Sequence, residues 1–355
     1  MSSLYRFFSP LLFTLEPESA HHLSILGLKF GLTGVSQTPF AASLSSTVFG
    51  LDFPTPVGLS AGYDKNGDVL DGLLKLGFGF VEAGSVTPKP QPGNPKPRIF
   101  RLKEDKAVIN RLGFNNAGLD VAARNFSRPR RDGVVGANLG ANKDSDDRIA
   151  DYVTGLKRLA PLADYVTVNI SSPNTPGLRA LQGKGELEEL LGRLMAARTD
   201  LQAERDQKIP LLLKIAPDLT DDDQSDIAAV ALETGLDGLI ISNTTITRPS
   251  SMQNPQKTET GGLSGEPLKA LSHALLKDMY RATEGRIPLV GVGGIRTAED
   301  AYERIMAGAS LVQFYSAMVY EGPSLARKIA EGLVELLKRD GYRSVADAVG
   351  AGNRI

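Results

Sequence analysis

The chain of 355 residues contains no cysteine and only three histidines. The absence of cysteine excludes a disulfide framework, a thiolate nucleophile and an iron–sulfur cluster ligated by this chain. His273 lies within an expected helix, and His21 and His22 lie in an N-terminal extension. We therefore expect no catalytic histidine, and any catalytic base has to be another residue type.

Charge of one sign is also lacking, because 40 Lys and Arg stand against 41 Asp and Glu. This balance gives no basic surface for nucleic acid, so we expect no nucleic-acid partner.

Long apolar runs are missing too. The most apolar segment, residues 4–15, is interrupted by Pro10 and followed by Glu16 and Glu18, so we expect neither a transmembrane helix nor a signal peptide.

The sequence does contain eight short apolar runs, each ending in a polar or glycine-rich turn. Helical patterns lie between them, and two begin with capping-box sequences at Thr220 and Thr297. This alternation predicts an α/β protein with one (β/α)8 TIM barrel. A doubly wound open sheet fits the alternation, but it does not explain polar residues after all eight strands. The expected strands are residues 57–61, 79–83, 134–137, 166–169, 211–213, 239–241, 289–292 and 310–314.

Residues 1–38 break this rhythm and form a small N-terminal α-helical extension to a barrel domain at residues 39–355. Apolar side chains crowd residues 4–15, a second helical pattern runs from Pro17 to near Gly31, and residues 33–39 are typical of a linker. Two short amphipathic helices of this kind suit a membrane surface or the entrance for an apolar ligand. The alternative is a cap packed on the bottom of the barrel.

A second interruption covers residues 87–116. Five prolines predict a stiff extended path, and residues 98–102 with 107–109 predict a β-hairpin. Insertions of this length on the catalytic face of a barrel are usually functional.

The most informative polar turn follows the fourth strand. A β-branched run ends at Asn169 and stops at Pro173, which presents Asn169, Ser172 and Asn174 where barrels keep their chemistry. Amides suit a flat ligand with amide edges, and a serine between them could take a proton. The alternative is a polar turn that closes a buried strand.

Five motifs follow one another along the chain: AGYDKNG at residues 61–67, NRLGFNN at 110–116, NISSPN at 169–174, SNTT at 242–245 and GVGGI at 291–295. Together these motifs resemble the dihydroorotate dehydrogenase family. The N-terminal extension and the serine in place of cysteine are similar to its quinone-linked class 2.

The resemblance implies oxidation of (S)-dihydroorotate to orotate in de novo pyrimidine (UMP) biosynthesis. It implies FMN as the hydride acceptor and ubiquinone or menaquinone as the final acceptor. We expect a monomeric peripheral protein on the cytoplasmic face of the cell membrane.

The resemblance also implies residue roles, with Ser172 as the base that removes the C5 proton. From its proximity to Ser172 in the sequence, we expect Thr175 with a water to relay that proton. Substrate contacts are expected from Lys65, Asn110, Arg111, Leu112, Gly113, Phe114, Asn169, Asn174, Asn243 and Thr244. FMN contacts are expected from Ala61, Gly62, Lys65, Ser85, Asn138, Asn169, Lys214, Ser242, Gly265, Gly294, Tyr315 and Ser316. The quinone tunnel is expected to contain His21, Arg101 and Tyr315.

Physical chemistry supports several of these roles. Gly293 and Gly294 before a capped helix, with Tyr315 and Ser316 after the last strand, match the phosphate cradle that barrels build from backbone N–H groups. The alternative for the glycines is a tight turn. For His21 it is an ordinary exposed helix residue, and for Arg101 it is a surface charge on the hairpin.

Two lysines have alternatives as well. Lys214 ends a strand over the barrel mouth, where it can stabilise negative charge on a reduced isoalloxazine. It could instead form a Schiff base, as in aldolases, or an ion pair with Asp218. Lys65 can bind the substrate carboxylate, or it can pair with Asp64 or Asp68.

Other functions fit less well. A tRNA dihydrouridine synthase needs a cysteine acid and a basic surface, and a 2-hydroxyacid oxidase needs a histidine at a strand end. A barrel that merely binds a phosphorylated ligand would leave Ser172 and Lys214 unexplained.

Overall fold

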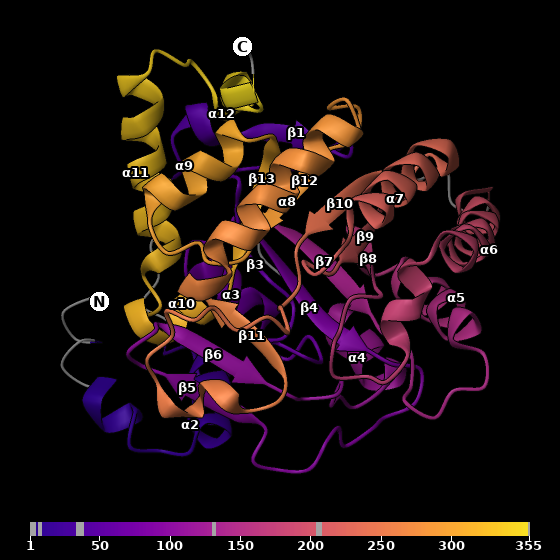
Figure 1. The fold of residues 1–355 in the computed structure, drawn as a ribbon, viewed down its shortest axis with the longest axis horizontal. Helices are drawn as coiled ribbons and strands as arrows, with labels where there is room; N and C mark the ends of the chain where they lie inside the picture. Colours follow the sequence, from indigo (N-terminus) through magenta and orange to yellow (C-terminus); the bar gives the residue numbers. More distant parts are fainter. Residues whose placement is uncertain (1–4, 6–8, 33–38, 130–132, 204–207, 354–355) are drawn as a thin grey trace.

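The computed structural model describes residues 5, 9–32, 39–129, 133–203 and 208–353. Its centre is a closed barrel of eight parallel strands, surrounded by helices (Figure 1). All eight expected strands are confirmed, with ends that differ by a few residues. In barrel order they are β3 (Val57–Leu59), β4 (Phe80–Val86), β7 (Val134–Leu139), β8 (Tyr165–Asn169), β9 (Leu211–Ile215), β10 (Gly238–Ile241), β12 (Leu289–Val292) and β13 (Ala309–Phe314).

The outer helices follow the strands in the expected alternation. The capping boxes at Thr220 and Thr297 are confirmed, since each side chain accepts the N–H of the residue three positions later. The helices around the barrel are α3 (Leu70–Lys75), α4 (Leu119–Phe126), α5 (Arg148–Leu159), α6 (Lys184–Ala203), α7 (Asp221–Thr234), α8 (Lys269–Ala282), α9 (Ala298–Met306), α10 (Ser316–Glu321), α11 (Leu325–Arg339) and α12 (Val345–Ala348). Short 3-10 turns occupy Ala42–Leu44, Leu178–Gln182, Pro255–Thr258, Glu266–Leu268 and Ala351–Asn353.

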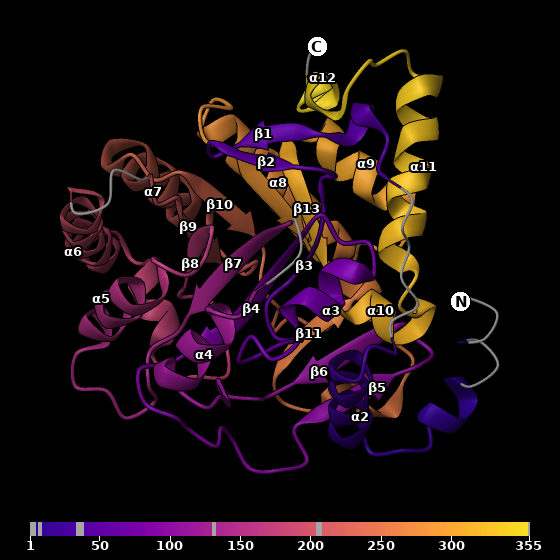
Figure 2. The same cartoon turned by 180° about the vertical axis from the view of Figure 1, so that it is seen from behind.

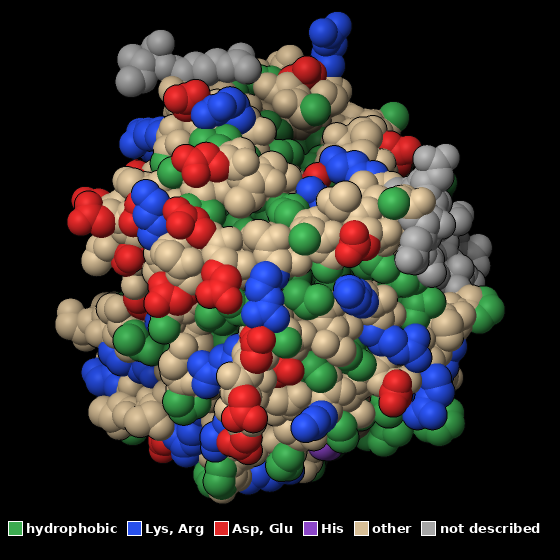
Figure 3. All heavy atoms as spheres, turned by 90° about the vertical axis from the view of Figure 1, so that its right-hand side faces the viewer, with side chains coloured by type: hydrophobic (Ala, Val, Ile, Leu, Met, Phe, Trp, Pro, Cys, Tyr) green, Lys and Arg blue, Asp and Glu red, His purple; other side chains and the backbone are tan. Residues whose placement is uncertain are grey.

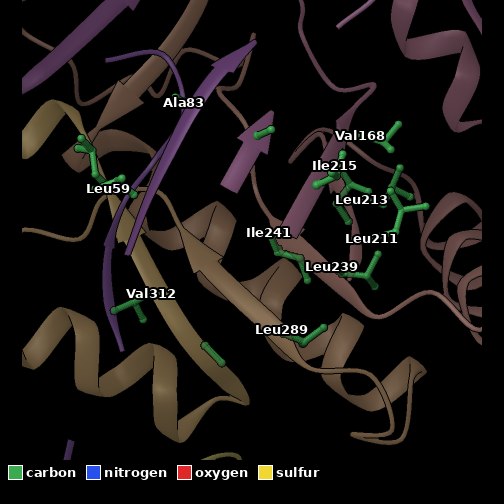
Figure 4. Packing of buried hydrophobic residues seen from close by; sticks show 14 of the residues in the cluster. Leu59, Ala83, Val168, Leu211, Leu213, Ile215, Leu239, Ile241, Leu289 and Val312 are labelled. Carbon is green, nitrogen blue, oxygen red and sulfur yellow. The ribbon is translucent and has the colours of Figure 1, made fainter. Parts of the chain in front are cut away.

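Alternating side chains of the strands divide the core into two parts. Leu59, Ala83, Val168 and Leu213 belong to the large cluster between strands and helices (Figure 4). The intervening residues, such as Phe80 and Leu212, belong to a second cluster inside the barrel. The same alternation brings the polar side chains near the strand ends into the barrel mouth.

A small hairpin closes the other end of the barrel. It consists of β1 (Ser46–Val48) and β2 (Leu51–Phe53). The ring of Phe53 packs edge-on against Phe80, with 5.2 Å between centroids. The hairpin and the N-terminal helix α2 (Pro17–Lys29) lie at opposite ends of the molecule (Figure 1). The alternative that the extension caps the barrel bottom is therefore wrong.

A three-stranded sheet stands at the mouth. Strands β5 (Ile99–Leu102) and β6 (Ala107–Asn110) form the expected hairpin, and α2 lies beside β5 (Figure 2). A third strand, β11 (Gly262–Gly265), pairs antiparallel with β6 and was not expected. Its sequence GLSG carries no alternating apolar pattern, so only its pairing partner defines it as a strand.

The described part of the extension exposes apolar side chains. Of the seven large hydrophobic side chains that are exposed among the described residues, six belong to residues 11–32: Leu11, Leu15, Leu23, Leu26, Phe30 and Leu32. Residues 1–4, 6–8 and 33–38, which include part of the apolar segment at 4–15 and most of the expected linker at 33–39, lie outside the described residues. No described helix is long and apolar enough to span a bilayer. On the face shown in Figure 3, acidic and basic side chains are interspersed.

Candidate active site

A cavity of about 470 Å³ opens at the mouth of the barrel. The carboxyl ends of the strands form its floor, and the sheet β5–β6–β11 and helix α2 enclose it. The expected base Ser172 lines it, and so do all but two of the residues expected to contact substrate, FMN or quinone. These lining residues are His21, Ala61, Gly62, Lys65, Ser85, Arg101, Asn110, Leu112, Gly113, Phe114, Asn169, Ser172, Asn174, Lys214, Ser242, Asn243, Thr244, Gly265, Gly294, Tyr315 and Ser316.

Arg111 and Asn138 are the two exceptions. The guanidinium of Arg111 binds Glu259 at 2.7 Å and stacks on the ring of Phe100. Asn138 is fully buried one layer deeper, where its Oδ1 accepts the hydroxyl proton of Ser85. Asn138 therefore orients Ser85, which lines the cavity, whereas the side chain of Arg111 is bound to Glu259 and does not line it.

Lys214 is buried at the centre of the floor, with 4% of its surface exposed. Its Nζ donates to Ser60 Oγ at 3.1 Å. Burial lowers the pKa of Lys214, and the negative charge of Glu82 partly opposes this effect. Asp218 binds Arg179 at 2.9 Å. The ion pair between Lys214 and Asp218 is thus wrong, and Lys214 offers an ammonium to the cavity.

A row of amides and hydroxyls crosses the floor beside Lys214. Asn138 Nδ2 donates to the buried carboxylate of Glu82 at 2.7 Å, and Asn169 Nδ2 donates to Ser85 Oγ at 2.9 Å. Asn243 Nδ2 in turn donates to Asn169 Oδ1 at 3.2 Å. Each amide is oriented by its neighbour, so the row presents fixed donors and acceptors to a ligand.

Ser172 lies in the loop that follows β8, and 6% of its surface is exposed. Its Oγ accepts the backbone N–H of Asn174 at 3.2 Å, and the Asn174 side chain donates to Asn110 Oδ1 at 3.3 Å. The hydroxyl of Thr175 is buried without a hydrogen-bond partner among the described residues. The structure thus brings the serine and the two asparagines together, while the relay through Thr175 stays a prediction.

Lys65 is half-buried at the cavity wall and has no ion pair among the described residues. Burial lowers its pKa to about 8. The expected alternatives are wrong, because Asp64 accepts the backbone N–H groups of Asp68 and Val69, and Asp68 pairs with Lys29 at 3.0 Å. An unpaired ammonium at a cavity wall suits an anionic group of a ligand.

Gly293 and Gly294 form the turn after β12, with φ angles of 115° and 72°. A Cβ on Gly294 would lie 2.6 Å from the Cα of Lys269, so the turn requires glycine there. The tight-turn interpretation is therefore correct. It is compatible with a phosphate cradle, because both glycines also line the cavity.

The opposite wall of the cavity belongs to α2 and the sheet. The rings of His21 and Tyr63 meet edge-on with 5.0 Å between centroids, and Tyr63 meets Tyr315 at 5.7 Å. Burial and the charge of Lys65 lower the pKa of His21 to about 3, so the imidazole is neutral. His21 is therefore not an ordinary exposed residue.

Arg101 is also not a simple surface charge on the hairpin. It donates to the carbonyls of Leu12, Phe13 and Leu15 and lies over the ring of Phe13 at 4.9 Å. The N-terminal segment is thereby attached to the mouth sheet.

Sequence reasoning missed Glu82. Its carboxylate also accepts hydrogen bonds from Tyr165, Thr167 and Gln313 inside the barrel. The signal in the sequence was a single acidic residue within the otherwise apolar run at residues 79–83. Because side chains alternate along a strand, Glu82 points into the barrel, as Phe80 does.

Comparison with known proteins gives consistent matches over most of the chain. The family model described as dihydroorotate dehydrogenase matches residues 43–337. A dihydroorotate dehydrogenase (quinone) of Parvibaculum lavamentivorans is 55% identical over 343 residues, which cover 96% of this chain and 97% of that protein. One of Rhodospirillum rubrum is 53% identical and covers 100% and 96%. The ligand-free DHODH of Eimeria tenella superimposes with a TM-score of 0.92 at 46% identity, covering 96% and 100%.

Proposed function

The chain belongs to the dihydroorotate dehydrogenase family, and we propose that the cavity at its barrel mouth is where the reaction takes place. As a quinone-linked member, the enzyme oxidises dihydroorotate in pyrimidine biosynthesis with a quinone as acceptor. One observation carries the assignment of the site. A single cavity contains Ser172, Lys65 and Lys214 together with residues of helix α2.

The family depends on a flavin, and the residues of the floor fit FMN. When bound, FMN supplies a hydride acceptor. The donor set matches such a group: a buried ammonium at Lys214, neutral amides at Asn169 and Asn243, and bare backbone at Gly293 and Gly294. Lys214 would stabilise negative charge, and the glycine turn would hold a phosphate.

On the substrate side, Lys65 binds the carboxylate, and the asparagine side chains bind the amide edges of the ring. Ser172 Oγ removes the proton from C5. The N–H of Asn174 holds that oxygen in place at 3.2 Å. Serine is a weak base, so the proton has to move on. The candidate relay is the hydroxyl of Thr175, three residues later, which is buried without a hydrogen-bond partner among the described residues.

The wall formed by α2, with His21, Arg101 and Tyr315, is the side from which ubiquinone or menaquinone enters. The exposed leucines and Phe30 of the extension make a peripheral contact with the cytoplasmic face of the membrane. We propose that the protein works there as a monomer.

The purified enzyme should be yellow and should bleach when dihydroorotate is added without oxygen. In the Ser172→Ala variant the rate of bleaching should fall by roughly 10²–10⁴-fold while FMN stays bound, because a positioned base contributes about that factor. Ser264→Ala, which removes a hydroxyl from the same cavity, is the matched control. If Ser172→Ala bleaches within about threefold of wild type, the base is another group.

A further inference from the structure

The proline-rich segment at residues 88–98 makes an unusual contact through Asn94. The side-chain Nδ2 of Asn94 donates to the carbonyl of Arg111 at 3.0 Å and to the carbonyl of Asn174 at 3.2 Å. Backbone carbonyls can only accept, which fixes the orientation of this amide. One NH₂ group therefore joins the loop at 110–116 to the loop at 171–176, and both loops line the substrate side of the cavity.

The contact lies two hydrogen bonds from the proposed base. Asn174 accepts from Asn94 through its carbonyl and donates to Ser172 Oγ through its N–H. The segment is also tightly seated against the first loop. A Cβ on Gly93 would lie 2.3 Å from the carbonyl oxygen of Leu112, and a Cβ on Gly113 would lie 2.8 Å from the Asn94 amide. A displacement of the segment therefore has to displace both loops.

The other end of this connection is helix α2. Arg98 Nη1 donates to the carbonyls of Pro92 and Asn94 at 2.7 and 2.8 Å. The remaining edge of its guanidinium binds the carboxylate of Glu18 at 3.1 and 2.7 Å. Glu18 is in the first turn of α2, and both charged side chains are buried, with 4% and 7% of their surfaces exposed.

We propose that Glu18, Arg98 and Asn94 are positioning residues that couple helix α2 to the two substrate loops. Helix α2 also lines the quinone side of the cavity through His21 and Ser24. The position of α2 at the quinone entrance thus influences how tightly the loops hold dihydroorotate or orotate. The link to the C5 proton rests on the proposed role of Ser172, whereas the link to ligand binding does not.

Asn94→Ala tests the substrate end. Without the amide, the dissociation constant of orotate, measured from the flavin absorption spectrum, should rise about tenfold, because two partly buried hydrogen bonds that join the loops are lost. Asn353→Ala is the control, since it removes a hydrogen bond from a side-chain amide to the carbonyl of Ala307, outside the cavity. An unchanged orotate constant in Asn94→Ala would overturn the proposal.

Asn94→Asp provides a second variant of nearly the same volume. An ionised carboxylate would face two carbonyls, so orotate should bind weakly at pH 7 and recover as the carboxyl protonates on acidification toward pH 5. A role in folding alone would not produce this recovery. Equal weakening at both pH values would count against the proposed contact.

Coupling to α2 is tested by a double-mutant cycle with Glu18→Gln. Glu18→Gln should raise the dissociation constant of orotate about fivefold, which is the lower end of couplings of ordinary size. It should have little further effect in the Asn94→Ala background. If the two effects multiply, or if Glu18→Gln leaves orotate binding unchanged, α2 is not coupled to the loops. Ser172→Ala reports separately on the base, so failure of that assignment is distinguishable from failure of the coupling.

Discussion

At the scale of single residues, Lys65 predicts a pH dependence of ligand binding. Burial lowers its pKa to about 8. A carboxylate binds the charged form, so orotate affinity should be highest below pH 8 and should fall above it, approaching about tenfold per pH unit. Titration of orotate binding from pH 7 to 9.5 measures this. Lys65→Arg keeps its charge throughout and controls for titration of the ligand itself, so an identical profile in that variant would exclude Lys65.

Lys214 predicts a change in redox potential. Replacing Lys214 by Met removes an ammonium group from the floor of the cavity. The flavin midpoint potential should fall by about 30 mV for each tenfold loss in relative affinity for the reduced form of this two-electron couple. Spectroelectrochemical titration measures the potential, and Lys214→Arg should largely restore it. An unchanged potential in a fully loaded Lys214→Met variant would assign the lysine a structural role.

Residues at strand ends could be predicted, and residues that depend on distant partners could not. Ser172, Lys214 and Asn243 each follow or end an apolar run, so the barrel topology alone gathers them. Asn94 lies in a proline-rich segment, and its role exists only because residues 111 and 174 come within reach of its amide. No local pattern encodes that contact.

At the scale of elements, the docking of α2 should depend on pH through Glu18. Its hydrogen bonds with Arg98 lower the pKa of Glu18 from 4.5 to about 2. The folded state thus favours the ionised form, and the stabilisation is complete above pH 4.5 and is lost as the pH falls toward 2. The difference in unfolding free energy between wild type and Glu18→Gln should therefore shrink from pH 5 to pH 3. A constant difference would mean that the carboxylate contributes no charge-dependent stability.

Elements with strong periodicity were predicted correctly, including the barrel strands, the hairpin β5–β6 and helix α2. Strand β11 was missed because it consists of Gly, Leu and Ser and becomes a strand only by pairing with β6. The hairpin β1–β2 was also not expected, since three residues per strand give too short a pattern to read. Its aromatic residues Phe49 and Phe53 pack into the cluster inside the barrel with Phe80.

At the scale of the whole molecule, exposed apolar side chains of the extension and residues of the wall proposed for quinone entry lie on the same helix, α2. His21, Leu23 and Ser24 line the cavity. Leu23 is also 50% exposed, and Leu26 and Phe30, which do not line the cavity, are 48% and 79% exposed. Their spacing of three and four residues places the three exposed side chains on one face of α2. If this face contacts the membrane as proposed, a lipid-soluble quinone enters the cavity without crossing water.

The variant Leu26→Ser/Phe30→Ser tests this arrangement, because neither residue lines the cavity. Each apolar side chain buried in lipid contributes about 1.5–3 kcal/mol, so the variant should lose most of its sedimentation with vesicles of phosphatidylcholine and phosphatidylglycerol. Turnover with a long-chain quinone in those vesicles should fall with it, whereas turnover with a short water-soluble quinone should stay near wild type. Ile246→Ser removes an exposed apolar side chain elsewhere and should change none of these. Vesicle binding that survives in the double variant would place the membrane contact on another surface and leave α2 only as the wall of the quinone entrance.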